Sequence, residues 1–206
     1  MDDGGLIVAI EGVDGAGKTT QAKRLVRFLR SRGLPAYYTS EPTDSKYGVI
    51  IRQMLRRRGV NPYILALLFA TDRLAHVEDV VKPLLRKGAV VVCDRYLYSS
   101  YAYQGVMTRR PLWVRDINSM APAPDLAILL DVPVREALGR KKRRIVFEDP
   151  DFLEEVRSEY LRICEAGLMV RIDAGGGIKE VFKALLDTVL PRLGIDAGLQ
   201  GRPGQV

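Results

Sequence analysis

The stretch GVDGAGKTT at residues 12–20 directly follows the apolar run LIVAI at residues 6–10. It matches G-x-x-x-x-G-K-[ST], a loop between a strand and a helix whose backbone N–H groups surround phosphate oxygens. The loop comprises Gly12, Val13, Asp14, Gly15, Ala16, Gly17, Lys18, Thr19 and Thr20. We expect these residues to bind a nucleoside triphosphate with Mg²⁺. Lys18 is then placed to reach the β- and γ-phosphates, and the Thr19 hydroxyl to hold Mg²⁺. The alternative is a glycine-rich strand–helix turn with a chance lysine.

The bulk composition is that of a globular protein with a full core, because 47% of the 206 residues are apolar and 28% are charged. We expect one domain at residues 1–193 and a flexible tail, rich in Gly and Pro, at 194–206. No apolar stretch reaches the ~18–20 residues that cross a bilayer, and the acidic start lacks the parts of a secretory signal. The two cysteines lack metal-site spacing. We therefore expect a cytoplasmic protein with no membrane partner.

Strand-like and helix-like segments alternate along the chain. Apolar, β-rich runs predict five strands, at residues 6–11, 36–39, 89–93, 126–131 and 168–172. Apolar spacing with cap and stop signals predicts helices at 17–31, 47–58, 62–86 (one helix or a broken one), 98–104, 112–121 and 178–193, and further helices that open at Pro133 and Asp149-Pro150. This alternation is typical of an α/β fold, with a five-stranded parallel sheet and helices on both faces. That three-layer α/β/α arrangement is the P-loop NTPase fold.

A polar cluster follows the third predicted strand. Asp94, Arg95 and Tyr96 stand at its carboxyl end, the edge at which open α/β sheets bind ligands. There Asp94 can hold Mg²⁺ or its waters, and Arg95 can bind a phosphate through two hydrogen bonds. The alternative is a structural ion pair, which also occurs at such positions.

Phe69 and Arg73 are four residues apart on a predicted helix and therefore share a face. Such a pair suits a nucleotide base, because the ring can stack on it and the guanidinium can donate to a base carbonyl. A core aromatic beside a surface arginine is the competing interpretation. Residues 99–105 supply hydroxyls, rings and an amide, which suits nucleoside recognition or an ordinary polar helix start.

The net charge is +7, with basic residues concentrated in short clusters at 56–58, 109–110 and 140–144. A positive balance fits either a nucleic-acid surface or a site for polyanionic small ligands. Because the sequence has no recognisable nucleic-acid module, we expect no nucleic-acid partner. A nucleic-acid-binding P-loop ATPase is the rival class, and DNA-stimulated ATP hydrolysis would identify it.

Taken together, these motifs resemble the bacterial and archaeal thymidylate (dTMP) kinase family. The resemblance rests on EGVDGAGKTTQ from Glu11, EPT from Glu41, FATDR from Phe69, DRY from Asp94 with residues 99–105, and PDL through LDVP at 124–133. It covers nearly the whole chain up to the tail. It implies that residues 12–20 bind ATP for the ATP-dependent phosphorylation of dTMP to dTDP in dTTP biosynthesis, with Mg²⁺, in a homodimer. Another nucleoside monophosphate or deoxynucleoside kinase of the same fold is the nearest alternative.

The resemblance also implies roles on the acceptor side. Phe69 matches the residue that stacks on thymine, and Arg73 the one that hydrogen-bonds the base. Arg95 matches the arginine that holds the acceptor phosphate, and Asp14 the acid that contacts the sugar. Tyr103 matches an aromatic that crowds a 2′-hydroxyl. The other expected dTMP contacts are Ser99, Ser100, Gln104 and Arg52.

Two positions depart from the family pattern. Many members have an arginine immediately before Glu-Pro, where this chain has Ser40, and Arg52 is the candidate to supply the missing phosphate contact. Some members carry an arginine after the acid of the phosphate loop, where this chain has Gly15. Members without it place arginines in a mobile lid, which residues 140–148 resemble.

The expected catalytic residues are therefore Lys18, Asp14, Arg95, Arg140, Arg143 and Arg144. The three lid arginines are candidates to close on the transferring phosphoryl group, where charge spreads over the equatorial oxygens. A solvated basic helix end is the alternative for this cluster.

Overall fold

The computed structural model describes residues 4–57, 59–140 and 149–195. Its strands are β1 (Leu6–Glu11), β2 (Ala36–Ser40), β3 (Val90–Asp94), β4 (Leu126–Asp131) and β5 (Val170–Asp173). Its helices are α1 (Lys18–Ser31), α2 (Lys46–Met54), α3 (Pro62–His76), η1 (Val77–Val81), α4 (Lys82–Leu85), α5 (Leu97–Thr108), α6 (Pro111–Ile117), α7 (Val134–Gly139), α8 (Pro150–Glu165) and α9 (Ile178–Arg192).

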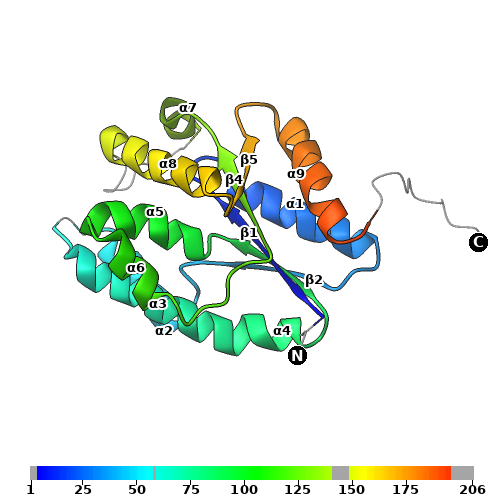
Figure 1. Cartoon of the computed structure of the whole chain (residues 1–206), viewed down its shortest axis with the longest axis horizontal. Helices are drawn as coiled ribbons and strands as arrows, with labels where there is room; N and C mark the ends of the chain where they lie inside the picture. Colours follow the sequence, from blue (N-terminus) through cyan, green and yellow to red (C-terminus); the bar gives the residue numbers. More distant parts are fainter. Residues whose placement is uncertain (1–3, 58, 141–148, 196–206) are drawn as a thin grey trace, which may run out of the picture.

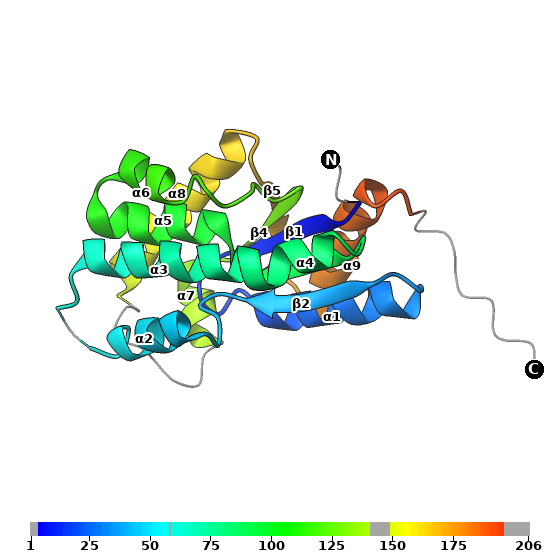
Figure 2. The ribbon, with the colours of Figure 1, turned by 90° about the horizontal axis from the view of Figure 1, so that it is seen from below.

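The five strands form one parallel sheet in the order β2-β3-β1-β4-β5. Helices α1 and α9 pack together on one face, while α3, α4, α5 and α8 cover the other (Figures 1 and 2). Because both faces are covered, β3 and β4 are buried at every residue. The predicted three-layer α/β/α fold is thus confirmed. Within the described residues, no helix is both long and apolar enough to cross a bilayer.

Residues 62–86, expected to form one helix or a broken one, are interrupted by a π-helical turn, η1, between α3 and α4. Pro83 explains the interruption, because its ring clashes with the carbonyl of Asp79 in a regular α-helix and it donates no backbone hydrogen bond. A wider turn just before it relieves the clash and lets the chain continue in the same direction.

The carboxyl ends of β1 and β3 meet at one edge of the sheet, since Ile10 is paired with Asp94. The phosphate-binding loop leaves β1 there, and α5 begins just beyond β3. This edge therefore brings together the phosphate-binding loop and the Asp94-Arg95 pair.

Candidate active site

The phosphate loop forms one wall of a large open cavity of about 860 Å³. The loop residues that line it are Asp14, Gly15, Ala16, Gly17, Lys18, Thr19 and Thr20. Gly12 and Val13 lie behind this surface: Val13 is in the hydrophobic core, and a side chain on Gly12 would collide with the carbonyl of Leu130. No side chain caps the start of α1, so its first N–H groups remain available to an anion.

Lys18 is almost fully buried in this cavity wall. Its Nζ donates to the carbonyl of Val13 at 2.9 Å and lies 3.9 Å from the carboxylate of Asp14. Burial, with a smaller contribution from the positive charge of Arg95, lowers the pKa of Lys18 to about 8. A polyphosphate in the cavity would place negative charge beside this amino group and so favour its protonated form.

Three oxygen-bearing side chains converge beside Lys18. The Thr19 hydroxyl donates to Asp94 Oδ2, and the Tyr38 hydroxyl donates to the same oxygen at 3.2 Å. Thr19 and Asp94 thus lie together, as expected for a shared magnesium site. Tyr38 was not expected here, and the pattern of β2 offers no signal for it beyond a half-buried strand position.

Arg95 lies between this cavity and a second, smaller one. Its backbone has a φ of +70°, a left-handed conformation that is costly for a residue with a side chain. The guanidinium forms an ion pair with Asp14 and donates to the Ser99 hydroxyl at 3.1 Å. Burial alone would lower the pKa of Arg95, but the Asp14 carboxylate together with Tyr103, Tyr160 and Asp94 outweighs it, and the pKa lies above its usual value. The structural ion pair considered for this motif is therefore present, and it joins Arg95 to Asp14.

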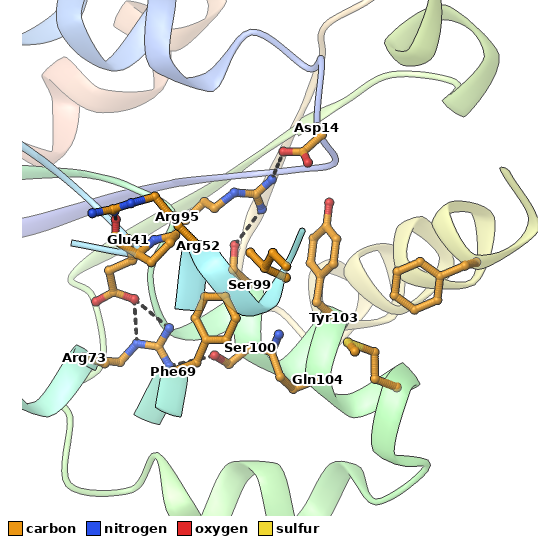
Figure 3. A pocket seen from close by; sticks show the side chains of 14 residues that line it. Asp14, Glu41, Arg52, Phe69, Arg73, Arg95, Ser99, Ser100, Tyr103 and Gln104 are labelled. Atoms are coloured by element: carbon orange, nitrogen blue, oxygen red, sulfur yellow. Dashed lines mark hydrogen bonds and ion pairs between the residues drawn. The ribbon is translucent and has the colours of Figure 1, made fainter. Parts of the chain in front are cut away.

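The smaller cavity has a volume of about 280 Å³ and is shown in Figure 3. All nine residues expected to contact dTMP line it, namely Asp14, Arg52, Phe69, Arg73, Arg95, Ser99, Ser100, Tyr103 and Gln104. Five further lining residues were missed by the sequence reasoning, namely Glu41, Pro42, Leu55, Met107 and Phe152. Glu41 and Pro42 belong to the EPT motif, which assigns them no role, while no local pattern gives the position of the other three around the cavity.

Tyr103 closes one side of the smaller cavity. Its ring lies against the guanidinium of Arg95 and meets the rings of Phe152 and Tyr160 edge to face. Its hydroxyl is buried and has no hydrogen-bond partner among the described residues. A buried hydroxyl without a partner is costly, so this group is poised to bond a ligand in the cavity.

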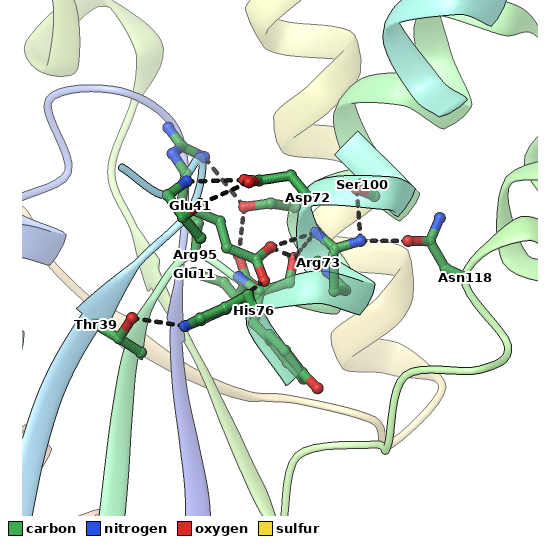
Figure 4. A network of polar contacts seen from close by, with 12 residues as sticks. Glu11, Thr39, Glu41, Asp72, Arg73, His76, Arg95, Ser100 and Asn118 are labelled. Carbon is green, nitrogen blue, oxygen red and sulfur yellow. Dashed lines mark hydrogen bonds and ion pairs between the residues drawn. The ribbon is translucent and has the colours of Figure 1, made fainter. Parts of the chain in front are cut away.

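Arg73 is a deeply buried cation of the smaller cavity, and its side chain is only 1% exposed. All five of its N–H groups have protein acceptors (Figure 4). Two go to Glu41, and one each to the Ser100 hydroxyl, the Asn118 amide oxygen and the Tyr96 carbonyl. The interpretation of Arg73 as a surface arginine is therefore wrong.

Arg52 and Ser40 lie on different cavities. Arg52 lines the smaller one and donates to the carbonyls of Pro42 and Thr43 at 3.0 and 2.6 Å. Ser40 lines the larger one. Because the two side chains do not share a cavity, the structure gives no direct support for Arg52 as a replacement for an arginine at position 40.

Arg140 lines the larger cavity at the end of α7 and donates to the carbonyls of Ala174 and Gly175 at 2.9 and 3.1 Å. Arg143 and Arg144 lie outside the described residues, as does the rest of the expected lid after Arg140. Most of the expected tail, from residue 196 onward, also lies outside them.

Comparison with known proteins shows similarity to one family. The family model described as thymidylate kinase matches residues 10–185. A protein named probable thymidylate kinase from Pyrococcus abyssi is 43% identical over 196 residues, covering 90% of this chain and 96% of its own length. One of the same name from Staphylothermus marinus is 38% identical, covering 93% and 98% of the two chains. The chain therefore belongs to the thymidylate kinase family.

Proposed function

We propose that this protein transfers the γ-phosphoryl group of ATP to dTMP, giving ADP and dTDP. The observation that carries the proposal is the shared wall of the two cavities, to which Asp14, Glu41 and Arg95 all belong. A triphosphate on the phosphate loop and a monophosphate in the smaller cavity would meet at Arg95. Placing the two reacting groups side by side supplies most of what phosphoryl transfer requires.

On the donor side, catalysis is charge stabilisation. The N–H groups of the loop and the ammonium of Lys18 surround the phosphates, and Arg140 adds a further cation at the rim of the cavity. Arg143 and Arg144 remain proposed lid residues, within a single kinase domain at residues 1–193. Closure of such a lid would exclude water and so limit hydrolysis of ATP.

The residues beside the loop suit Mg²⁺. The Thr19 hydroxyl and the Asp94 carboxylate are hard oxygen ligands, which this ion prefers. Among the described residues there is no cluster of three acidic, His or Cys ligands. Mg²⁺ at triphosphate sites takes only one or two protein ligands and completes its shell with water and phosphate oxygens. When bound, the ion would neutralise the charge that develops on the β- and γ-oxygens.

On the acceptor side, positioning replaces acid–base chemistry. The acceptor phosphate is itself the nucleophile and is ionised near neutral pH, so no strong general base is needed. Arg95, already held by Asp14 and Ser99, aligns that phosphate. Phe69 offers its ring to the base, and the amide of Gln104 and the hydroxyl of Ser100 offer polar contacts to its edge (Figure 3).

Arg73 can bond a base carbonyl only by sharing or exchanging an N–H that it now gives to a protein acceptor. The bond to Ser100 is the one to exchange, because Ser100 lines the same cavity and its hydroxyl can rotate to another partner. Tyr103 fills the space beside Arg95, which favours a deoxyribose over a ribose with its extra hydroxyl.

The decisive experiment measures ADP release from MgATP with a panel of acceptors: dTMP, dUMP, dCMP, UMP, thymidine and single-stranded DNA. We expect dTMP to give the highest kcat/KM. Preference for another monophosphate or for thymidine would refute the acceptor and leave the kinase class standing. ADP release stimulated by DNA, with no phosphorylated nucleotide formed, would refute the kinase class.

We also propose a homodimer formed through the outer face of α3. Ile64, Leu67 and Leu74 are 51%, 48% and 40% exposed on that helix, and Met120 beside it is 73% exposed. Leu67, Leu74 and Met120 line a shallow groove between α3 and the end of α6, a surface that a second copy would cover. Leu67→Glu should give a monomer by light scattering, whereas Leu168→Glu, at a similarly exposed position on another face, should not.

A further inference from the structure

We propose that His76 is a positioning residue for the acceptor: it fixes Glu41, which in turn fixes Arg73 in the wall of the smaller cavity. The identity of the acceptor as dTMP rests on the proposed function above. Figure 4 shows the three side chains in contact within one buried network. The activity described above does not require His76, which touches neither phosphate loop nor cavity.

The geometry gives each carboxylate oxygen of Glu41 its own partner. His76 Nδ1 lies 3.0 Å from Oε1, and Arg73 Nε and Nη2 lie 3.0 and 2.6 Å from Oε2. Arg73 and His76 are three residues apart on α3 and so reach Glu41 from the same face of that helix. All three side chains are at least 95% buried. Both carboxylate oxygens of Glu41 are therefore bound by side chains of α3.

The hydrogen-bond pattern places a hydrogen on Nδ1 of the imidazole. Glu41 Oε2 accepts two bonds from a guanidinium, so Glu41 is a carboxylate and acts only as an acceptor. His76 Nδ1 must then carry a hydrogen. The Thr39 hydroxyl lies 2.6 Å from Nε2 and forms a hydrogen bond with this second nitrogen. This arrangement satisfies every polar atom of His76.

Loss of the Nδ1 donor would disturb the cavity through Arg73. Glu41 Oε1 would be left buried without its charge-assisted bond, which is costly enough to make the carboxylate turn toward another donor. Because Glu41 holds two of the five N–H groups of Arg73, the guanidinium plane would tilt with it. The Arg73 bond to Ser100 on the cavity wall would then change, while the phosphate loop would not.

Two substitutions separate this role from a merely structural one. The amide nitrogen of Asn lies where Nδ1 of His does, and that of Gln lies where Nε2 does. His76→Asn therefore keeps a donor for Glu41 and loses Thr39, whereas His76→Gln keeps Thr39 and loses Glu41. We expect His76→Gln to raise KM for dTMP about tenfold and KM for ATP much less, because Glu41 lines both cavities but Arg73 lines only the smaller one. His76→Asn should stay within about twofold of wild type for both.

Equal effects of the two substitutions, or a KM for ATP that rises in step with that for dTMP, would overturn the proposal. If His76→Gln does not fold by circular dichroism, Glu41→Gln and Thr39→Val replace it. The first should raise KM for dTMP, and the second should not; the reverse would overturn the proposal. The acceptor panel is run first on the wild type. If it prefers another monophosphate, the proposed function fails, and the variants are then compared with that acceptor.

Discussion

Gly15→Ala tests how tightly α7 packs on the phosphate loop. Gly15 has a φ of +91°, and a Cβ added there would lie 2.1 Å from the carbonyl oxygen of Ala137. Gly17 has the same φ of +91°, but a Cβ added there meets nothing within 4 Å. The two alanine variants therefore share the backbone strain, and only Gly15→Ala adds a steric overlap.

The expected magnitudes follow from these two terms. Forcing an L-residue into the left-handed region costs about 1–2 kcal/mol. The overlap adds about 1–3 kcal/mol, the range for overpacking a closed site, because α7 cannot withdraw freely. Ala137 and Val134 anchor it, being 0% and 1% exposed. At ~2–4 °C per kcal/mol for a domain of this size, Gly17→Ala should lower Tm by about 5 °C and Gly15→Ala by about 10 °C.

Scanning calorimetry without nucleotide is the assay, because bound nucleotide would itself raise Tm. Gly33→Ala is the control outside the site, since Gly33 has a φ of +80° and open space around it. It should match Gly17→Ala. If Gly15→Ala lost no more than these two, α7 would be free to move off the loop, and the reasoning from its packing would be refuted.

Three further outcomes are expected. Burial alone would raise the pKa of Asp131, but hydrogen bonds from Arg157 and Arg171 outweigh it, and the pKa lies below its usual value. The stabilisation by Asp131 is thus present above about pH 4 and is lost as pH falls through the folded-state pKa. In Asp131→Asn, the free energy of unfolding, measured with urea, should therefore fall less steeply with decreasing pH than in the wild type. Because the pKa of Lys18 is about 8, polyphosphate binding at that pH should take up about half a proton in calorimetry across buffers, and Lys18→Arg should abolish the uptake. Phe69→Leu should raise KM for dTMP about three- to tenfold through lost stacking and leave KM for ATP unchanged; an equal rise in both would argue against a base contact.

The fold and the centre of the site could be predicted because their signals are local. The phosphate-loop motif predicts the strand before it and the helix after it, and Asp94-Arg95 marks the end of a buried strand. Parallel strands place these two ends at one edge, so their meeting follows from the sheet alone.

The rest of the site depends on tertiary packing. Phe152 comes to the smaller cavity from α8, which packs on α5, and no pattern in the sequence states that contact. The sequence does not predict the contacts of Glu41 for a similar reason, because its partners Arg73 and His76 are more than thirty residues away. Tyr38 lies in a segment that is predicted as a strand, but only the pairing of β2 with β3 brings its hydroxyl to Asp94.

Packing also accounts for the residue at position 15. The backbone of α7 occupies the space into which any side chain at Gly15 would project, so an arginine cannot be added to the loop while α7 stays in place. The same helix ends at Gly139 and is followed by Arg140, which lines the cavity of the phosphate loop. One helix thus excludes a cation from the loop and delivers another to the rim of the same cavity. A loop arginine and a close-packed α7 are therefore structural alternatives, and this chain has the second.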